Sequence, residues 1–199
     1  MTPEQAAALA ASLTWQCPLA QIVADNLTHQ FPWVRRHALV LVGQRGKRSM
    51  YVAVDRNGNP FPFPYPANPL VNLEALNGLL QREGVRLPGA VQPEALADTL
   101  RSLLLGPGGF VGSSAFWDQQ KRHMQMWTSR SPAEGPELFR RHCRDPRLQQ
   151  SDRGWTLEFF HFNRRGGVEA WHVTGDVEQI LQATVAPAVP NGTFLFPDV

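Results

Sequence analysis

The sequence predicts a single α+β domain over residues 1–199, in which an antiparallel sheet of two β-hairpins packs with six to seven helices. Two observations support this prediction. Strand-like runs occur in pairs around glycine-containing turns, which is the pattern of hairpins. Helix-like runs lie before, between and after these pairs instead of alternating singly with strands, which favours an antiparallel sheet.

Residues 1–33 are expected to form a pair of helices. Thr2 can cap the first helix, and Gln5 lies at the capping-box position three residues later. A second helix is expected from Pro18, because apolar residues recur at helical spacing as far as Leu27.

Residues 34–66 are expected to contain the first hairpin. Two runs rich in β-branched and aliphatic residues flank a turn at Arg45 and Gly46. A turn centred there places Leu41 opposite Met50. Both faces of the hairpin are apolar, so we expect central strands that are covered on both sides.

Residues 72–143 are expected to form a helical block. Asn72 can cap its first helix, Pro93 begins the second, and Ser113 or Ser114 can cap a third that reaches Trp127. A short helix then closes the block. The second helix shows an apolar stripe of Leu96, Leu100 and Leu103, which we expect to be buried, as we do Leu39 and Val52 of the first hairpin.

Residues 155–185 are expected to form the second hairpin and a last helix capped by Asp176. The hairpin register is set by placing Asn163 opposite Val168. The sheet then has four strands, or five if residues 193–196 add an edge strand.

This register makes His161 and His172 diagonal neighbours on one sheet face. Two imidazoles at that separation can share a metal ion or a proton, so they are the candidate catalytic residues. A zinc site needs a third protein ligand, and none lies nearby at a diagnostic spacing, so we predict neither a metal nor a cofactor. The alternative is that both histidines are packed side chains. Glu158 and Glu169 are placed together on the opposite face, as an acid/base pair or as surface charges.

The glycine-rich run Gly106–Gly112 precedes a helix, which is the geometry of an anion site. It has neither the lysine of a Walker loop nor the spacing of a dinucleotide-binding loop, and a helix end, a turn and a serine cap explain it as well. The helix after Ser114 has a wide apolar stripe, typical of a core helix or, if exposed, of a docking surface.

Basic residues occur at both expected hairpin tips, and they are the candidate binding residues: Arg45, Lys47 and Arg48 on the first, and Arg164 and Arg165 on the second. If the tips lie side by side, they form a basic edge that attracts phosphate or an acidic protein surface. The alternative is that they are solvated turn residues. Aromatic residues that would stack on bases are missing from the tips, so nucleic acid is the less favoured partner.

The chain has no apolar run long enough to cross a membrane, and its first residues do not resemble a signal peptide. Cys17 and Cys143 lie far apart without the spacing of a metal site or a disulfide framework. We therefore expect reduced thiols, a cytoplasmic protein and no membrane partner.

No segment has a specific catalytic, metal-binding or nucleotide-binding signature. We expect a non-catalytic intracellular binding or accessory protein that acts through a basic or aromatic surface on an anionic or protein partner. The alternative is a small enzyme with a cleft near His161 and His172. A positive patch without a deep pocket would favour binding, and a concave site that joins these histidines to an acid, His142 or Cys143 would favour the enzyme.

Overall fold

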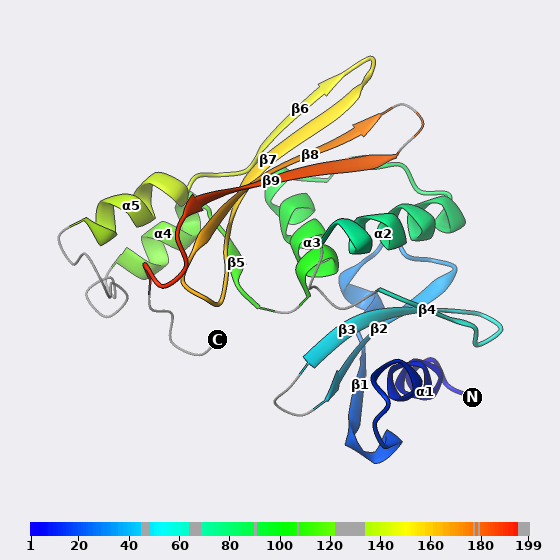
Figure 1. The fold of residues 1–199 in the computed structure, drawn as a ribbon. Helices are drawn as coiled ribbons and strands as arrows, with labels where there is room; N and C mark the ends of the chain where they lie inside the picture. Colours follow the sequence, from blue (N-terminus) through cyan, green and yellow to red (C-terminus); the bar gives the residue numbers. More distant parts are fainter. Residues whose placement is uncertain are drawn as a thin grey trace. The chain divides into compact units, whose positions relative to one another are not determined.

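The structure, a computed structural model, describes residues 1–44, 48–63, 69–89, 91–106, 108–121, 134–176, 178 and 180–194. The chain divides into a first unit of residues 1–86 and 103–107 and a second unit of residues 87–102 and 108–199 (Figure 1). Each unit contains its own antiparallel sheet. The predicted α+β class is confirmed, but the prediction that both hairpins share one sheet is wrong.

The first unit has a four-stranded sheet in the order β1-β2-β3-β4, with every neighbouring pair antiparallel. Its elements are α1 (Pro3–Trp15), the short 3-10 helices η1 (Leu19–Gln21) and η2 (Thr28–Gln30), β1 (Ile22–Asn26), β2 (His37–Gln44), β3 (Arg48–Asp55), β4 (Pro60–Pro62) and α2 (Pro69–Glu83).

The N-terminal helix α1 begins as its sequence predicts. The Thr2 hydroxyl accepts a hydrogen bond from the Gln5 backbone N–H at 3.3 Å, and the Gln5 side chain accepts one from the Thr2 N–H at 3.0 Å. This capping box satisfies two N–H groups that a helix start otherwise leaves without partners.

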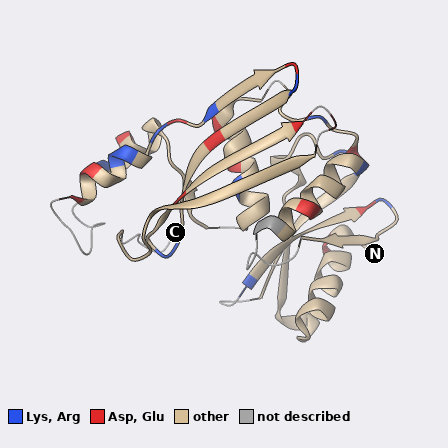
Figure 2. Ribbon diagram, turned by 45° about the horizontal axis from the view of Figure 1, so that its top comes forward, with Lys and Arg blue, Asp and Glu red and all other residues tan. Residues whose placement is uncertain are grey.

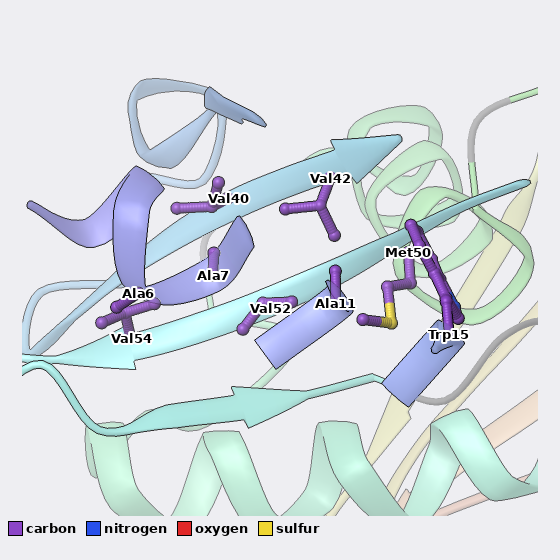
Figure 3. Packing of buried hydrophobic residues seen from close by; sticks show 9 residues of the cluster. All are labelled: Ala6, Ala7, Ala11, Trp15, Val40, Val42, Met50, Val52 and Val54. Carbon is purple, nitrogen blue, oxygen red and sulfur yellow. The ribbon is translucent and has the colours of Figure 1, made fainter. Parts of the chain in front are cut away.

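Small side chains bring α1 close to one face of the first sheet (Figure 3). The buried cluster consists of Ala6, Ala7, Ala11 and Trp15 from α1 with Val40, Val42, Met50, Val52 and Val54 from β2 and β3. Leu39 and Tyr51, on the opposite face of the same strands, are also buried. The prediction of central strands covered on both sides is therefore confirmed.

The predicted second helix is wrong. Residues 22–26 form strand β1, which pairs along β2 from Ile22 opposite Gln44 to Asn26 opposite Val40. Ile22 and Ala24 pack against the α1 cluster. A short apolar run fits a helix and a strand almost equally well. Here the segment forms a strand because it can make backbone hydrogen bonds with the edge of β2.

The first hairpin exists, but its predicted register is wrong by one residue. Met50 lies opposite Val42 instead of Leu41, and the last pair before the turn is Gln44 with Arg48. Three residues therefore separate the strands, where the sequence-based register assumed four. In the helical block, Asn72 does not cap α2, which starts at Pro69. Asn72 is buried inside that helix and donates to the Leu104 carbonyl at 2.7 Å.

The second unit has a five-stranded sheet in the order β5-β7-β8-β9, with β6 also pairing with β7. Its elements are β5 (Phe110–Val111), α4 (Ser114–Gln120), α5 (Gly135–His142), β6 (Arg147–Ser151), β7 (Gly154–Phe162), β8 (Val168–Asp176) and β9 (Leu181–Val189). The helix α3 (Pro93–Leu105) belongs to this unit as far as residue 102.

The predicted last helix is also wrong, because residues 181–189 form strand β9. The Asp176 carboxylate accepts from the Ile180 N–H at 3.0 Å, so it caps the turn between β8 and β9. Pro187 lies beyond the predicted helix and has no N–H to donate, which an edge strand such as β9 tolerates. Figure 2 shows β9 free of charged residues along its length.

The described residues contain five α-helices, fewer than the six to seven predicted. Part of the predicted helix at 114–127 lies outside the described residues, as do residues beyond 194 of the predicted edge strand. Within the described parts, no helix is long and apolar enough to cross a bilayer. A single domain would unfold as one cooperative unit, which only a measurement of unfolding tests. The single domain over residues 1–199 therefore stays a prediction.

The expected core positions Leu39, Val52, Leu96, Leu100 and Leu103 are each at most 1% exposed. We predict that Leu100→Ala lowers the free energy of unfolding by about 2–5 kcal/mol, because the substitution removes buried surface and leaves a cavity. Urea denaturation measures this change. Leu13→Ala is the control, because Leu13 is 72% exposed, and it should change the free energy by less than about 0.5 kcal/mol. Equal effects of the two substitutions would contradict the assignment of Leu100 to the core.

Candidate functional site

The turn between β7 and β8 is fixed by Asn163. Its backbone N–H donates to the Gly167 carbonyl, and its own carbonyl accepts from the Gly166 N–H, both at 3.0 Å. Its side-chain oxygen also accepts from the N–H groups of Arg165 and Gly167 at 3.0 Å. Gly166 has a φ of 72°, a left-handed conformation that glycine adopts without strain. Together these features make a three-residue hairpin loop ended by a left-handed glycine.

This turn shifts the hairpin by one residue from the predicted register. Val168 lies opposite Phe162 instead of Asn163, and consequently His161 pairs with Glu169 and His172 pairs with Glu158. Side chains alternate between the two faces along a strand. A shift of one residue therefore moves each β8 side chain to the opposite face from the one predicted, relative to the side chains of β7. The predicted pairing of the two histidines on one face is wrong, and so is that of the two glutamates.

His161 points into the second unit and is 4% exposed. Its Nδ1 lies 3.2 Å from Glu169 Oε2, and the same carboxylate accepts from the Trp171 indole and the Asn163 amide, both at 3.3 Å. The hydrogen bond with His161 is the main reason that the pKa of Glu169 lies below its ordinary value of 4.5, in spite of partial burial. The inward histidine is therefore part of a partly buried polar network around an ionised glutamate.

The glycine-rich run packs against this histidine. Gly109 has a φ of 72°, and a side chain there would collide with the Phe162 carbonyl and with His161 Nε2. Gly112 donates to the Phe160 carbonyl at 2.8 Å, and Ser113 caps α4 as predicted. Close backbone packing thus accounts for Gly109 and Gly112. A phosphate site is not needed to explain them.

On the outer face of the second sheet, four cross-strand neighbours form a polar row: Arg147, Glu158, His172 and Thr184, one from each of β6, β7, β8 and β9. Three spacings of about 4.8 Å between strands give this row a length of about 14 Å. His172 Nδ1 lies 3.5 Å from Glu158 Oε1, and the two side chains are 48% and 56% exposed.

An apolar strip lies beside the polar row, where Phe160, Ala170 and Ala186 are neighbours across β7, β8 and β9. The Arg144 guanidinium lies 5.3 Å from the centre of the Phe160 ring, and the His142 ring is 4.8 Å from it in an edge-on arrangement. Burial, and then the charges of Arg144 and Arg141, lower the pKa of His142 below 6.5, so its imidazole is neutral at pH 7.

The row and the strip together line a groove of about 320 Å³, which we call the outer groove. It contains His172 but not His161. Its main polar and aromatic residues are Arg144, Arg147, Glu158, Phe160, His172 and Thr184. The groove is at the lower end of the size range of small-molecule sites.

The candidate basic residues have different surroundings. Arg45 and Lys47 lie outside the described residues. The Arg48 guanidinium donates to the Trp15 carbonyl at 2.8 Å and to the Gln44 side chain at 3.2 Å, and it lies 4.9 Å from the centre of the Trp15 ring. Arg48 therefore attaches the end of α1 to the first sheet.

At the second tip, the Arg164 side chain lies against Gly108, and Arg165 is exposed. The two tips belong to different sheets, so the single-sheet basis for a common basic edge no longer holds. The role of all five basic residues in binding stays a prediction.

Sequence reasoning missed Arg144 and Arg147 because it missed strand β6. The signal for this strand was present, since Asp152 and Arg153 form a two-residue turn between the paired residues Ser151 and Gly154. A polar strand such as β6 lacks the apolar alternation by which strands are usually recognised.

Among the described residues, neither the buried thiol of Cys143 nor a group of metal-ligating side chains provides a second site. Cys17 and Cys143 are free cysteines, and burial raises the pKa of Cys143 to about 12, which suppresses its thiolate. Within the ranges that the structure describes, no group of three His, Cys, Asp or Glu side chains could hold a metal ion.

Comparisons of the chain with protein-family models, with curated proteins and with solved structures find no match. Any functional conclusion therefore depends on the geometry of the chain itself.

Glu169 should make the stability of the protein sensitive to acid. Its lowered pKa means that the ionised carboxylate stabilises the folded state at neutral pH, and that this contribution is lost as the pH falls below 4.5 through the folded-state pKa. We predict that Glu169→Gln destabilises the protein at pH 7 and that its difference from the wild type shrinks at pH 3. Urea midpoints at both pH values measure this, and an equal difference at both would contradict the ionised network.

Proposed function

We propose that this chain is a non-catalytic binding protein whose outer groove takes a ligand with a flat apolar group and an anionic group. The observation that supports the proposal most is the meeting of cations and apolar surface in one groove. Arg144 lies against the Phe160 ring, and Arg147 begins the polar row beside it.

The charges around the groove leave both arginines available to a ligand. The Asp145 carboxylate accepts from the Ser114 backbone N–H at 2.7 Å and from its hydroxyl at 3.0 Å. The Glu158 side chain contacts that of His172, at 3.5 Å between Oε1 and Nδ1. Among the described residues, neither Arg144 nor Arg147 forms an ion pair with a carboxylate. An anionic group would provide the partner that these guanidinium groups lack.

The apolar strip suits a flat group. Ala170 and Ala186 have short side chains, so they leave space above the sheet beside the Phe160 ring. An aromatic ring of a ligand gains from contact with Phe160 and from a guanidinium over its face. A flat acid would therefore use the strip and the arginines together.

The Glu158–His172 pair is the basis of the enzymatic alternative. A general acid or base works best where water is excluded and where its partner holds it in one orientation. Here both side chains are about half exposed, and 3.5 Å separates their nearest polar atoms. The groove also lacks the second histidine that the predicted catalytic cleft contained. We therefore favour binding over catalysis.

Titration with 2-naphthoate, a flat aromatic carboxylate, tests this function. We expect saturable binding that shifts the backbone amide signals of residues 144, 145, 147, 158–160, 170–172 and 184–186 in two-dimensional NMR spectra. Arg147→Gln should weaken binding about fivefold, as expected for the loss of one solvent-screened charge pair.

Two controls separate this site from non-specific adsorption. Arg153→Gln removes an exposed arginine at the β6–β7 turn, outside the outer groove, and should leave the affinity within twofold. The neutral analogue 2-naphthalenemethanol should bind more weakly than 2-naphthoate. Signal shifts elsewhere on the protein, or equal affinities for the acid and the alcohol, would overturn the proposal.

A further inference from the structure

Three arginines of the first unit come from separate segments and line one open depression. Arg36 precedes β2, Arg56 follows β3, and Arg82 lies in the last turn of α2. The depression has a volume of about 490 Å³, and its other lining residues are His37, Asp55 and Asn57. We call Arg36, Arg56 and Arg82 the arginine cluster. The depression shares no lining residue with the outer groove.

A buried glutamate holds the first of these segments. The Glu83 side chain is 0% exposed, and its carboxylate accepts from the backbone N–H of Arg35 at 2.7 Å and from that of Arg36 at 2.8 Å. The same carboxylate lies 2.6 Å from His37 Nδ1. Burial opposes ionisation, but the hydrogen bonds from Arg35, His37 and Arg36 outweigh it and lower the pKa of Glu83. The ionised carboxylate thus fixes residues 35–37 to the end of α2.

The side chains of Arg36 and Arg82 make further contacts that hold them in place, whereas at Arg56 a turn fixes the backbone. The Arg82 guanidinium lies 4.3 Å from the centre of the Phe61 ring, and Arg36 Nη1 donates to the Arg82 carbonyl at 3.0 Å. Arg56 lies in the turn that Asp55 closes by accepting from the backbone N–H groups of Asn57 and Asn59, both at 2.8 Å. Arginines that are ordered before a ligand arrives lose less side-chain entropy on binding.

The two nearby carboxylates do not neutralise these arginines directly. The oxygens of Glu83 are occupied by the donors of residues 35–37, and those of Asp55 by the turn, including the Asn59 amide at 2.8 Å. Three arginines, Arg36, Arg56 and Arg82, line one depression, and no carboxylate among the described residues forms an ion pair with them.

We propose that the arginine cluster is a second binding site, for a phosphate or pyrophosphate group. Planar guanidinium groups match phosphate oxygens with paired hydrogen bonds, and a phosphate group offers several oxygens and up to two negative charges. Three arginines from three segments suit such a group better than a single carboxylate, which two arginines would already saturate. The site lies in the first unit, so it adds a binding activity that the outer groove does not provide.

Calorimetric titration with inorganic pyrophosphate, in about 50 mM salt and without divalent cations, tests this inference on the full chain. We expect saturable binding that weakens about tenfold in Arg56→Gln and in Arg82→Gln. Arg35→Gln is the matched control, because Arg35 is exposed and adjacent in sequence but does not line the depression. Its backbone hydrogen bond to Glu83 does not depend on the side chain, so this variant should lose less than twofold.

Circular dichroism of each variant should match the wild type, so that a loss of affinity reports on the site. Three outcomes would overturn the inference. One is the absence of measurable heat up to 10 mM pyrophosphate. Another is an equal loss in Arg35→Gln and Arg56→Gln, which would indicate a diffuse charge effect. The third is binding of a single-stranded oligonucleotide without binding of pyrophosphate, which would indicate an extended polyanion surface.

Discussion

The register of the β7–β8 hairpin decides which side chains of the second unit face its core and which face outward. Asn163 sets this register with four hydrogen bonds, two from its backbone and two to its side chain, and Gly166 supplies the left-handed residue that ends the loop. Glu169 then lies beside His161 in the interior, and Glu158 lies beside His172 outside. The outer groove exists because this pairing aligns one polar row across four strands.

In both units, a carboxylate that accepts several hydrogen bonds organises the residues around it. Glu169 holds a histidine, an indole and an amide around it, and Glu83 holds the backbone before β2 together with a histidine. In each case the anion is satisfied by donors that are not arginine side chains. In the first unit, the arginine cluster is consequently left without a carboxylate partner among the described residues. In the second unit, Arg144 and Arg147 lie at the outer groove, on the other side of the sheet from Glu169. In the first unit, this separation of a buried anion from exposed cations is the physical basis of the proposed phosphate site.

The sequence predicts correctly the elements that have local signals. It fails for segments whose secondary structure depends on pairing with another part of the chain. Short sequence patterns predict the capping box of α1, both hairpins and the buried leucines. Each of these patterns depends on residues that are close together in the sequence. Strands β1 and β9 were taken for helices, since each acquires its structure by pairing with a neighbouring strand. Each hairpin register was wrong by one residue, because the loop has three residues and not four. That small error placed His161 and His172 together, and the missed strand β6 hid Arg147.

The central claim is the register that builds this row, and cross-strand proton contacts measured by NMR test it most directly. Backbone protons of directly opposite residues in an antiparallel pair lie close enough to give nuclear Overhauser effects. The structure predicts such contacts between His172 and Glu158 and between Glu169 and His161. Contacts between like protons (Hα with Hα, or amide with amide) of His172 with Phe159 and of Ala170 with His161 would instead place both histidines on one face and contradict the account.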